Sequence, residues 1–174
     1  MFSFIRIRRK RLALRRAIWN RNLEEVQALV REGLDVNFVI GHSSPLATAV
    51  WMEDRRIIDF LVAQGASPAR AGNESFLVGA ARSGDHDLID LGLAAGCDIH
   101  LAPRHTPTPL QVAAFCNRPE TMKYLIARGA TKDDFDVQKC VWRPIRSATI
   151  RVLLDLGVKV PGEIVEAVKG GDWL

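Results

Sequence analysis

Residues 108–133, TPLQVAAFCNRPETMKYLIARGATKD, decide the fold because they hold two helical patterns and the residues that separate them. Thr108 can cap a helix, and Pro109 suits the first helical position, where a missing N–H is no loss. Residues 117–119 interrupt this pattern, and a second amphipathic run follows. Gly129 ends that run, as expected of a residue that adopts the left-handed conformation freely. The stretch is therefore a helix-turn-helix unit, and its apolar face needs neighbours to bury it.

The same pattern recurs along the chain. Leu110 is followed by Ala three residues later, by the apolar Met122 twelve residues later and by Gly nineteen residues later. Three other leucines begin the same spacing: Leu14, Leu46 and Leu77. These four leucines, called anchors below, lie 32, 31 and 33 residues apart. An internal period of about 33 residues is typical of repeat proteins, in which each unit covers its neighbour.

These residues resemble the ankyrin repeat family. The family's TPLHxA motif is similar to TPLQVA at 108–113 and SPLATA at 44–49. Its closing LLxxGADxN motif is similar to LVREGLDVN at 29–37, LVAQGAS at 61–67 and LIARGAT at 125–131. The motif's His is replaced by Ala47 and Gln111. In the family this His ties adjacent loops, so the resemblance implies looser loops here. The resemblance to the family covers nearly the whole chain.

The resemblance implies an all-α fold, an ankyrin-repeat solenoid of about five helix-turn-helix repeats with β-hairpin-like loops and a C-terminal capping helix. The expected parts are a basic and apolar N-terminal arm at 1–11 and an ankyrin repeat domain at 12–174. The repeats are expected near 12–43, 44–74, 75–107, 108–133 and 134–160, with a half-repeat cap at 161–174.

Two repeats depart from the pattern. In the third, Phe76 takes the proline position and Gly92 stands where other repeats have leucine, which predicts a small hole or a closer helix approach. We expect this repeat to be the least regular. The fifth has a shortened front, with its first helix expected around 137–142. A lone helix at 162–170 then forms the cap.

Positive charge is concentrated at the start of the chain. The formal net charge is +4, but the first 16 residues contain seven basic residues and no acidic one. The rest of the chain has 17 basic and 20 acidic residues. The arm's basic residues are Arg6, Arg8, Arg9, Lys10 and Arg11, and they interleave with Phe2, Phe4, Ile5 and Ile7. Two interpretations stay open: the arm caps the first repeat, or it attracts nucleic acid, anionic lipid or an acidic partner.

The cysteines and the hydropathy of the sequence indicate the cellular compartment of the protein. Cys97, Cys116 and Cys140 show no paired spacing. The first residues lack the order and the apolar length of a secretory signal. No stretch approaches the roughly 18 apolar residues of a membrane span. These features predict reduced thiols in a cytoplasmic protein.

Catalytic and metal-binding patterns are not apparent. Cys97, His100 and His105 lack the fourth ligand and the close pairing of a zinc site. Three aspartates lack the calcium-loop pattern and are expected to cap the following helix: Asp133, Asp134 and Asp136. No nucleophile elbow, zinc-protease helix or phosphate loop occurs. We therefore expect no enzyme, no catalytic residue, no cofactor and no metal.

The candidate binding residues come from the resemblance, which places positions five and six after each anchor on the concave face. These are Trp19 and Asn20, Trp51 and Met52, Arg82 and Ser83, Phe115 and Cys116. Large aromatic and arginine side chains dominate the energetics of many interfaces. The alternative is that these side chains pack against one another inside a shallow inner layer.

The loops add the family's other contact positions, three, five and six residues before each anchor. These are Ile40, Gly41 and Ser43; Ala71, Gly72 and Glu74; Arg104, His105 and Pro107; and, before the first anchor, Arg8, Arg9 and Arg11. The basic residues thus share a rim with the aromatic positions. Such a surface suits a protein partner that is acidic and partly apolar.

The leading hypothesis is a non-catalytic module that binds another protein through its concave face and loops. One specific form is an inhibitor or immunity-type partner of an enzyme or toxin. The alternative is an adaptor that binds nucleic acid or an anionic membrane through the basic arm. Salt separates the two, because phosphate-driven binding weakens steeply with ionic strength. The chain alone is expected to be a monomer.

Overall fold

The computed structural model describes residues 2–40, 43–70, 75–100, 107–135, 146–162 and 165. The chain divides into two compact units, which are taken separately below. Unit 1 contains residues 1–79 and 90–97, and unit 2 contains residues 80–89 and 98–174. Within the described residues, no helix combines the length and the apolar character needed to cross a bilayer.

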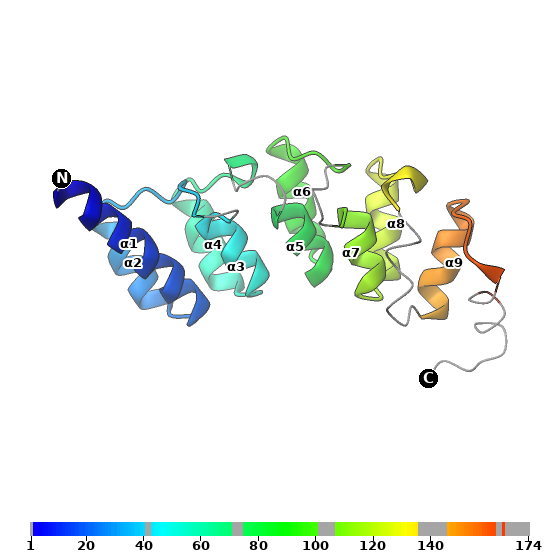
Figure 1. The fold of residues 1–174 in the computed structure, drawn as a ribbon, viewed down its shortest axis with the longest axis horizontal. Helices are drawn as coiled ribbons and strands as arrows, with labels where there is room; N and C mark the ends of the chain where they lie inside the picture. The colour runs from blue at the N-terminus through cyan, green and yellow to red at the C-terminus, as the bar shows by residue number, and fades with distance from the viewer. Residues whose placement is uncertain are drawn as a thin grey trace. The chain divides into compact units, whose positions relative to one another are not determined.

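Unit 1 is built from helical hairpins. Its elements are α1 (Phe2–Trp19), α2 (Leu23–Arg31), α3 (Pro45–Trp51), α4 (Arg55–Ala63), the 3-10 turn η1 (Pro68–Arg70) and parts of α5 (Ser75–Ser83) and α6 (His86–Ala94). α1 packs on α2, and α3 packs on α4 (Figure 1). The two hairpins also stack, because α1 contacts α3 and α2 contacts α4. The anchors Leu14 and Leu46 are buried between these helices.

Unit 2 continues the pattern. Besides the rest of α5 and α6, it contains α7 (Pro109–Phe115), α8 (Pro119–Ala127), the 3-10 turn η2 (Lys132–Asp134) and α9 (Ser147–Asp155). α8 packs against both α7 and α9. Every regular element of the described residues is helical, and an isolated bridge joins Ile40 to Ser43. The expected all-α class is confirmed. The expected first helix of the fifth repeat, at 137–142, lies outside the described residues, as does most of the capping helix.

The turns inside the hairpins repeat the same backbone geometry. The seventh residue after each anchor has a positive φ: 54° at Arg21, 53° at Glu53, 79° at Gly84 and 51° at Asn117. Only one of these is glycine, although a left-handed backbone costs other residues about 1–2 kcal/mol. Glycine also ends the second helices, with Gly129 at φ 108°. The equivalent positive φ of Gly157 (78°) confirms that α9 ends like the other second helices.

The segment expected as an N-terminal arm is helical instead. From Phe2 to Arg11 it forms the first turns of α1, which has 18 residues against seven in α3. The reason is composition, since this segment contains no Gly or Pro and is rich in strong helix formers. Ile5 and Ile7 are 51% and 42% exposed, so they do not fold back over the first repeat as a cap.

In the third repeat, the two helices approach each other closely at Gly92, and no hole is left there. Phe76 is buried, with 1% of its surface exposed. A Cβ added to Gly92 would lie 2.7 Å from Leu77 Cδ2 and 3.1 Å from the Phe76 ring. The Phe76 ring and Leu77 thus take the space that a leucine fills in the other repeats. The two departures from the pattern compensate for each other.

The loop of the first repeat is tied to the next repeat by Asn37. Its Nδ2 donates a hydrogen bond to the Gly65 carbonyl oxygen (2.8 Å), and its Oδ1 accepts one from the Ser67 N–H (2.9 Å). The Asp35 carboxylate accepts from the Asn37 N–H (2.8 Å) and fixes the turn. The looser loop that the missing motif His implied is not what the structure shows here, because an asparagine makes the tie instead.

The corresponding loop in unit 2 is tied by His100. The Asp98 carboxylate accepts from its N–H (2.9 Å), as Asp35 does for Asn37. The His100 Nδ1 lies 2.9 Å from both carboxylate oxygens of Asp134. Asp134 also accepts from the Thr131 N–H (2.6 Å), so it caps its own 3-10 turn. Asp134 thus links two loops, and the helix that it was expected to cap lies outside the described residues.

Candidate protein-interaction surface

Trp19 and Trp51 end two neighbouring helices, α1 and α3. Because α1 stacks on α3 and α2 stacks on α4, the hairpins are parallel and both helices end at the same edge of unit 1 (Figure 1). Trp19 is 56% exposed and Trp51 is 39% exposed. Trp19 and Trp51 therefore occupy equivalent, partly exposed positions of two stacked repeats.

The partial burial of Trp51 has a local cause. A Cβ added to Gly79 of α5 would lie 2.8 Å from Val50 Cγ1 and 3.9 Å from Trp51 Cδ1. Glycine at this position therefore lets α5 approach α3 closely. One edge of the indole lies against α5, and 39% of the residue stays exposed. The alternative, that the aromatic side chains pack against one another, stays a prediction.

The other predicted residues are spread over the chain. Asn20 is exposed and Met52 is half-buried beside the two tryptophans in sequence. Ile40 and Ser43 face each other across the isolated bridge. In unit 2, Arg82 and Phe115 are both half-buried near the ends of α5 and α7. Six predicted contact residues lie outside the described residues: Gly41, Ala71, Gly72, Glu74, Arg104 and His105.

The basic residues of α1 have different surroundings. Lys10 forms an ion pair with Glu32, the residue that follows α2 (2.6 Å), and its hydrogen bond lowers the pKa of that carboxyl. Arg6, Arg8 and Arg9 are exposed. Within the described residues, no acidic side chain forms an ion pair with Arg8 or Arg9. Part of the positive charge of α1 is therefore available to a ligand.

A groove that the sequence did not reveal runs between α1 and the loop that follows α2. It has a volume of about 400 Å³ and is lined by Ile7, Arg8, Arg11, Leu12, Val39 and Ile40. Only Arg8, Arg11 and Ile40 were among the predicted contact residues. Leu12 and Val39 were missed because their exposure depends on how the loop lies beside the helix.

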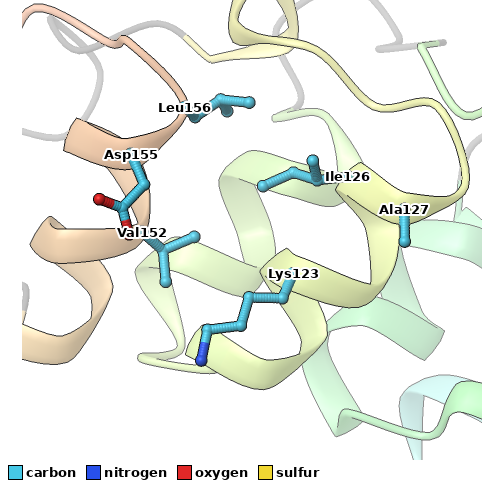
Figure 2. A pocket seen from close by; sticks show the side chains of 6 residues that line it. All are labelled: Lys123, Ile126, Ala127, Val152, Asp155 and Leu156. Carbon is cyan, nitrogen blue, oxygen red and sulfur yellow. The ribbon is translucent and has the colours of Figure 1, made fainter.

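A second cleft lies between α8 and α9 in unit 2 (Figure 2). It has a volume of about 380 Å³ and is lined by Lys123, Ile126, Ala127, Val152, Asp155 and Leu156. Figure 2 shows side chains of both helices around the space between them. Its lining is mostly apolar, and its Lys123 already donates a hydrogen bond to Glu120 (2.8 Å). The described residues that line this cleft include no set of catalytic or metal-binding groups.

Two titratable groups considered in the sequence, Cys97 and His100, have shifted pKa values. Burial raises the pKa of the Cys97 thiol, which disfavours the nucleophilic thiolate. His100 bonds to Asp134, and this hydrogen bond raises the pKa of the imidazole. Within the described residues, no three His, Cys, Asp or Glu side chains cluster as a metal site requires. The described residues thus form an exposed helix edge, a groove and a cleft, and they bring together no catalytic group.

Stacked helical hairpins with exposed aromatic helix ends define a helical repeat protein. Residues 108–137 match the family model of the ankyrin repeat. Over 134 residues, the chain is 29% identical to "Ankyrin repeat domain-containing protein SAT10" of Stachybotrys chartarum. That alignment covers 74% of this chain and 6% of the relative, so the chain spans a small part of the relative's length. The resemblance to the ankyrin repeat family is confirmed. Ankyrin repeats are generally protein–protein interaction modules and are typically non-enzymatic.

Proposed function

We propose that this chain binds another protein through the edge of unit 1 where α1 and α3 end. The supporting observation is the pair of exposed indoles, Trp19 and Trp51, at equivalent positions of stacked repeats. Tryptophan combines a large apolar surface with a hydrogen-bond donor, which makes it a frequent centre of binding energy. Concave-face and loop residues of both units belong to the proposed contact set: Arg82 and Phe115 on the helices, and Ile40, Ser43, Glu74, Arg104 and His105 in the loops.

The magnitude of the effect follows from the exposed area. A tryptophan side chain buries about 150–250 Å² when fully enclosed. Covering the exposed parts of both rings would contribute at most about 6 kcal/mol at roughly 25 cal/mol per Å². Ordering of side chains and loss of free motion offset part of this gain. A loss of about 2–3 kcal/mol on removing both rings is the reasonable expectation.

The experiment begins with the full chain immobilised and exposed to proteins of the cells that produce it. Captured proteins are identified by mass spectrometry and then purified, and their dissociation constants are measured by calorimetry. Trp19→Ala/Trp51→Ala should weaken binding by at least about tenfold. Leu154→Ala serves as the matched control, because Leu154 is 43% exposed but lies on α9 of unit 2. A double variant that binds as tightly as the wild type would contradict the proposal.

Salt provides an independent check against the adaptor hypothesis. An interface anchored by aromatic rings should lose little affinity as ionic strength rises. Binding driven by phosphates should weaken steeply under the same change. A captured nucleic acid or lipid whose binding depends on salt but not on the two tryptophans would favour the adaptor function instead.

The proposal extends to an inhibitor or immunity-type role, in which the chain covers a functional surface of an enzyme or toxin. The test uses the purified partner from the capture experiment. Its activity is measured with and without an excess of the chain. Inhibition that disappears with Trp19→Ala/Trp51→Ala supports this role, whereas full partner activity in the saturated complex rules it out.

A further inference from the structure

The groove between α1 and the following loop exists because α1 is longer than the other first helices. Aligning the anchors Leu14 and Leu46 places Arg8 at the position equivalent to Ile40. The extra turns of α1 therefore stand where the other repeats have a loop. They lie beside the loop at 38–40, as the shared lining of the groove shows. This surface has helix on one side and extended chain on the other.

The chemistry of the groove combines aliphatic and positive groups. Ile7, Leu12 and Val39 are 42%, 46% and 43% exposed, so much of the apolar lining faces solvent. Arg8 and Arg11 complete the lining from α1, and none of the lining residues that the structure describes is acidic. The helix residues are spaced so that Ile7 lies one turn before Arg11, and Arg8 one turn before Leu12. Apolar and cationic groups therefore alternate along one face.

Arg11 is held in place by the loop. Its guanidinium carbon lies 5.0 Å from the centroid of the Phe38 ring, which is a cation–π arrangement. Its Nε is shielded from solvent, and within the described residues it has no hydrogen-bond partner. A guanidinium fixed in this way loses little freedom when a carboxylate binds to its remaining N–H groups. The site is therefore prepared for an anionic group beside apolar surface.

We propose that this groove binds an acidic peptide segment of a partner protein, with aliphatic or aromatic side chains between its carboxylates. The inference rests on the proposed protein-binding function but assigns a second surface, separate from the two tryptophans. Charge complementarity supports an acidic ligand, and the exposed aliphatic lining supports a partly apolar one. Nucleic acid fits less well, because Phe38 is 5% exposed and lies under Arg11, and none of the described lining residues offers a ring for base stacking. A membrane surface fits less well, because the apolar side chains line a hollow between two segments.

The test selects ligands directly with the full chain. A display library of random short peptides is panned against the immobilised wild-type protein, and enriched peptides are synthesised with a fluorescent label. Anisotropy then gives their affinity for the wild type and for Arg8→Gln/Arg11→Gln. Arg151→Gln is the control, since it removes an exposed arginine of α9 in unit 2. Trp19→Ala/Trp51→Ala is measured in parallel, and circular dichroism checks that each variant is folded.

We expect enriched peptides to combine Asp or Glu with Leu, Ile or Phe. Arg8→Gln/Arg11→Gln should weaken them by about tenfold or more, while Arg151→Gln stays within about twofold. Unchanged affinity in the tryptophan variant supports a separate groove, even if the tryptophan edge proves inactive. An absence of enrichment, or peptides that bind Arg8→Gln/Arg11→Gln as well as the wild type, would overturn the inference. Tighter binding of single-stranded DNA or of vesicles containing phosphatidylserine, lost in Arg8→Gln/Arg11→Gln, would overturn it in favour of that ligand. Light scattering that shows groove-dependent self-association would overturn it in favour of a second copy.

Discussion

The two units use the same loop position with different chemistry. In unit 1, the amide of Asn37 donates to one backbone group and accepts from another. In unit 2, the imidazole of His100 pairs with the carboxylate of Asp134. Both residues are preceded by an aspartate that accepts their N–H. The comparison shows that the turn is fixed locally, while the residue at its end decides whether the tie between repeats depends on pH.

The largest effect is expected at the close contact between α5 and α6 inside unit 1. Gly92→Leu would place a side chain in the space filled by Phe76 and Leu77. Overpacking of this kind typically costs about 1–3 kcal/mol, and the contact at 2.7 Å places the change at the upper end. Chemical denaturation should show an earlier transition for the whole chain.

A second variant tests whether the Phe76 ring is the reason why leucine does not fit at position 92. Phe76→Pro/Gly92→Leu recreates the pairing of Pro45 with Leu61 in the second repeat. It should recover at least about half of the stability that Gly92→Leu loses, because the leucine then fills the space left by the ring. If the double variant is no more stable than the sum of the single losses predicts, Phe76 and Gly92 do not compensate for each other.

An intermediate effect is expected from breaking the tie in unit 1. Asn37→Ala removes the bonds to Gly65 and Ser67 and should destabilise the chain by about 1–2 kcal/mol. Because an amide does not titrate, the loss should be the same on both sides of neutral pH. Urea denaturation measures it, and Asn20→Ala, at an exposed asparagine, should change stability by less than about 0.5 kcal/mol. Equal losses in the two variants would show that the tie contributes nothing.

The smallest effect concerns the tie in unit 2. The hydrogen bond to Asp134 raises the pKa of His100 above its ordinary value of 6.5. The stabilisation is therefore complete below that ordinary value and is lost as pH rises through the raised folded-state pKa. His100 is about half exposed, at 51% of its side chain, so water weakens the pair and the change should be modest.

The measurement compares the urea midpoint of the wild type with that of His100→Asn across this pH range. The wild type should lose more stability with rising pH than His100→Asn, which has no titrating group at this position. NMR titration of the His100 ring gives the pKa directly. A ring pKa at or below 6.5 would remove the basis of the prediction.

Much of the fold could be predicted from the sequence because local signals coincide with the repeat. Thr108 and Pro109 begin α7 as expected, and Thr108 accepts a hydrogen bond from the Gln111 N–H (3.1 Å) in a capping box. The glycines that end the second helices adopt the predicted positive φ, as at Gly129. Helix caps and helix-ending glycines depend on residues that are close in the sequence, so they can be predicted from the sequence alone.

The rest depended on contacts between segments. The continuous helix from Phe2 was missed because alternating apolar and basic residues were interpreted as an arm, although helix propensity favoured a helix. The groove was missed because Val39 is exposed only through the position of its loop. The roles of Asn37 and His100 depend on acceptors and donors about 30 residues away, which no local pattern indicates.

The length of α1 has a consequence for affinity. Ile7 in the groove and Trp19 at the end of the helix are separated by about 18 Å along the axis, at about 1.5 Å per residue. An extended chain spans that distance with about five or six residues. A partner whose acidic segment and tryptophan-binding pocket are joined by such a linker would engage both sites at a high effective concentration. Two individually weak contacts on one helix would then give bivalent binding. Such binding would favour partners in which the acidic segment and the tryptophan-binding pocket lie at the matching distance.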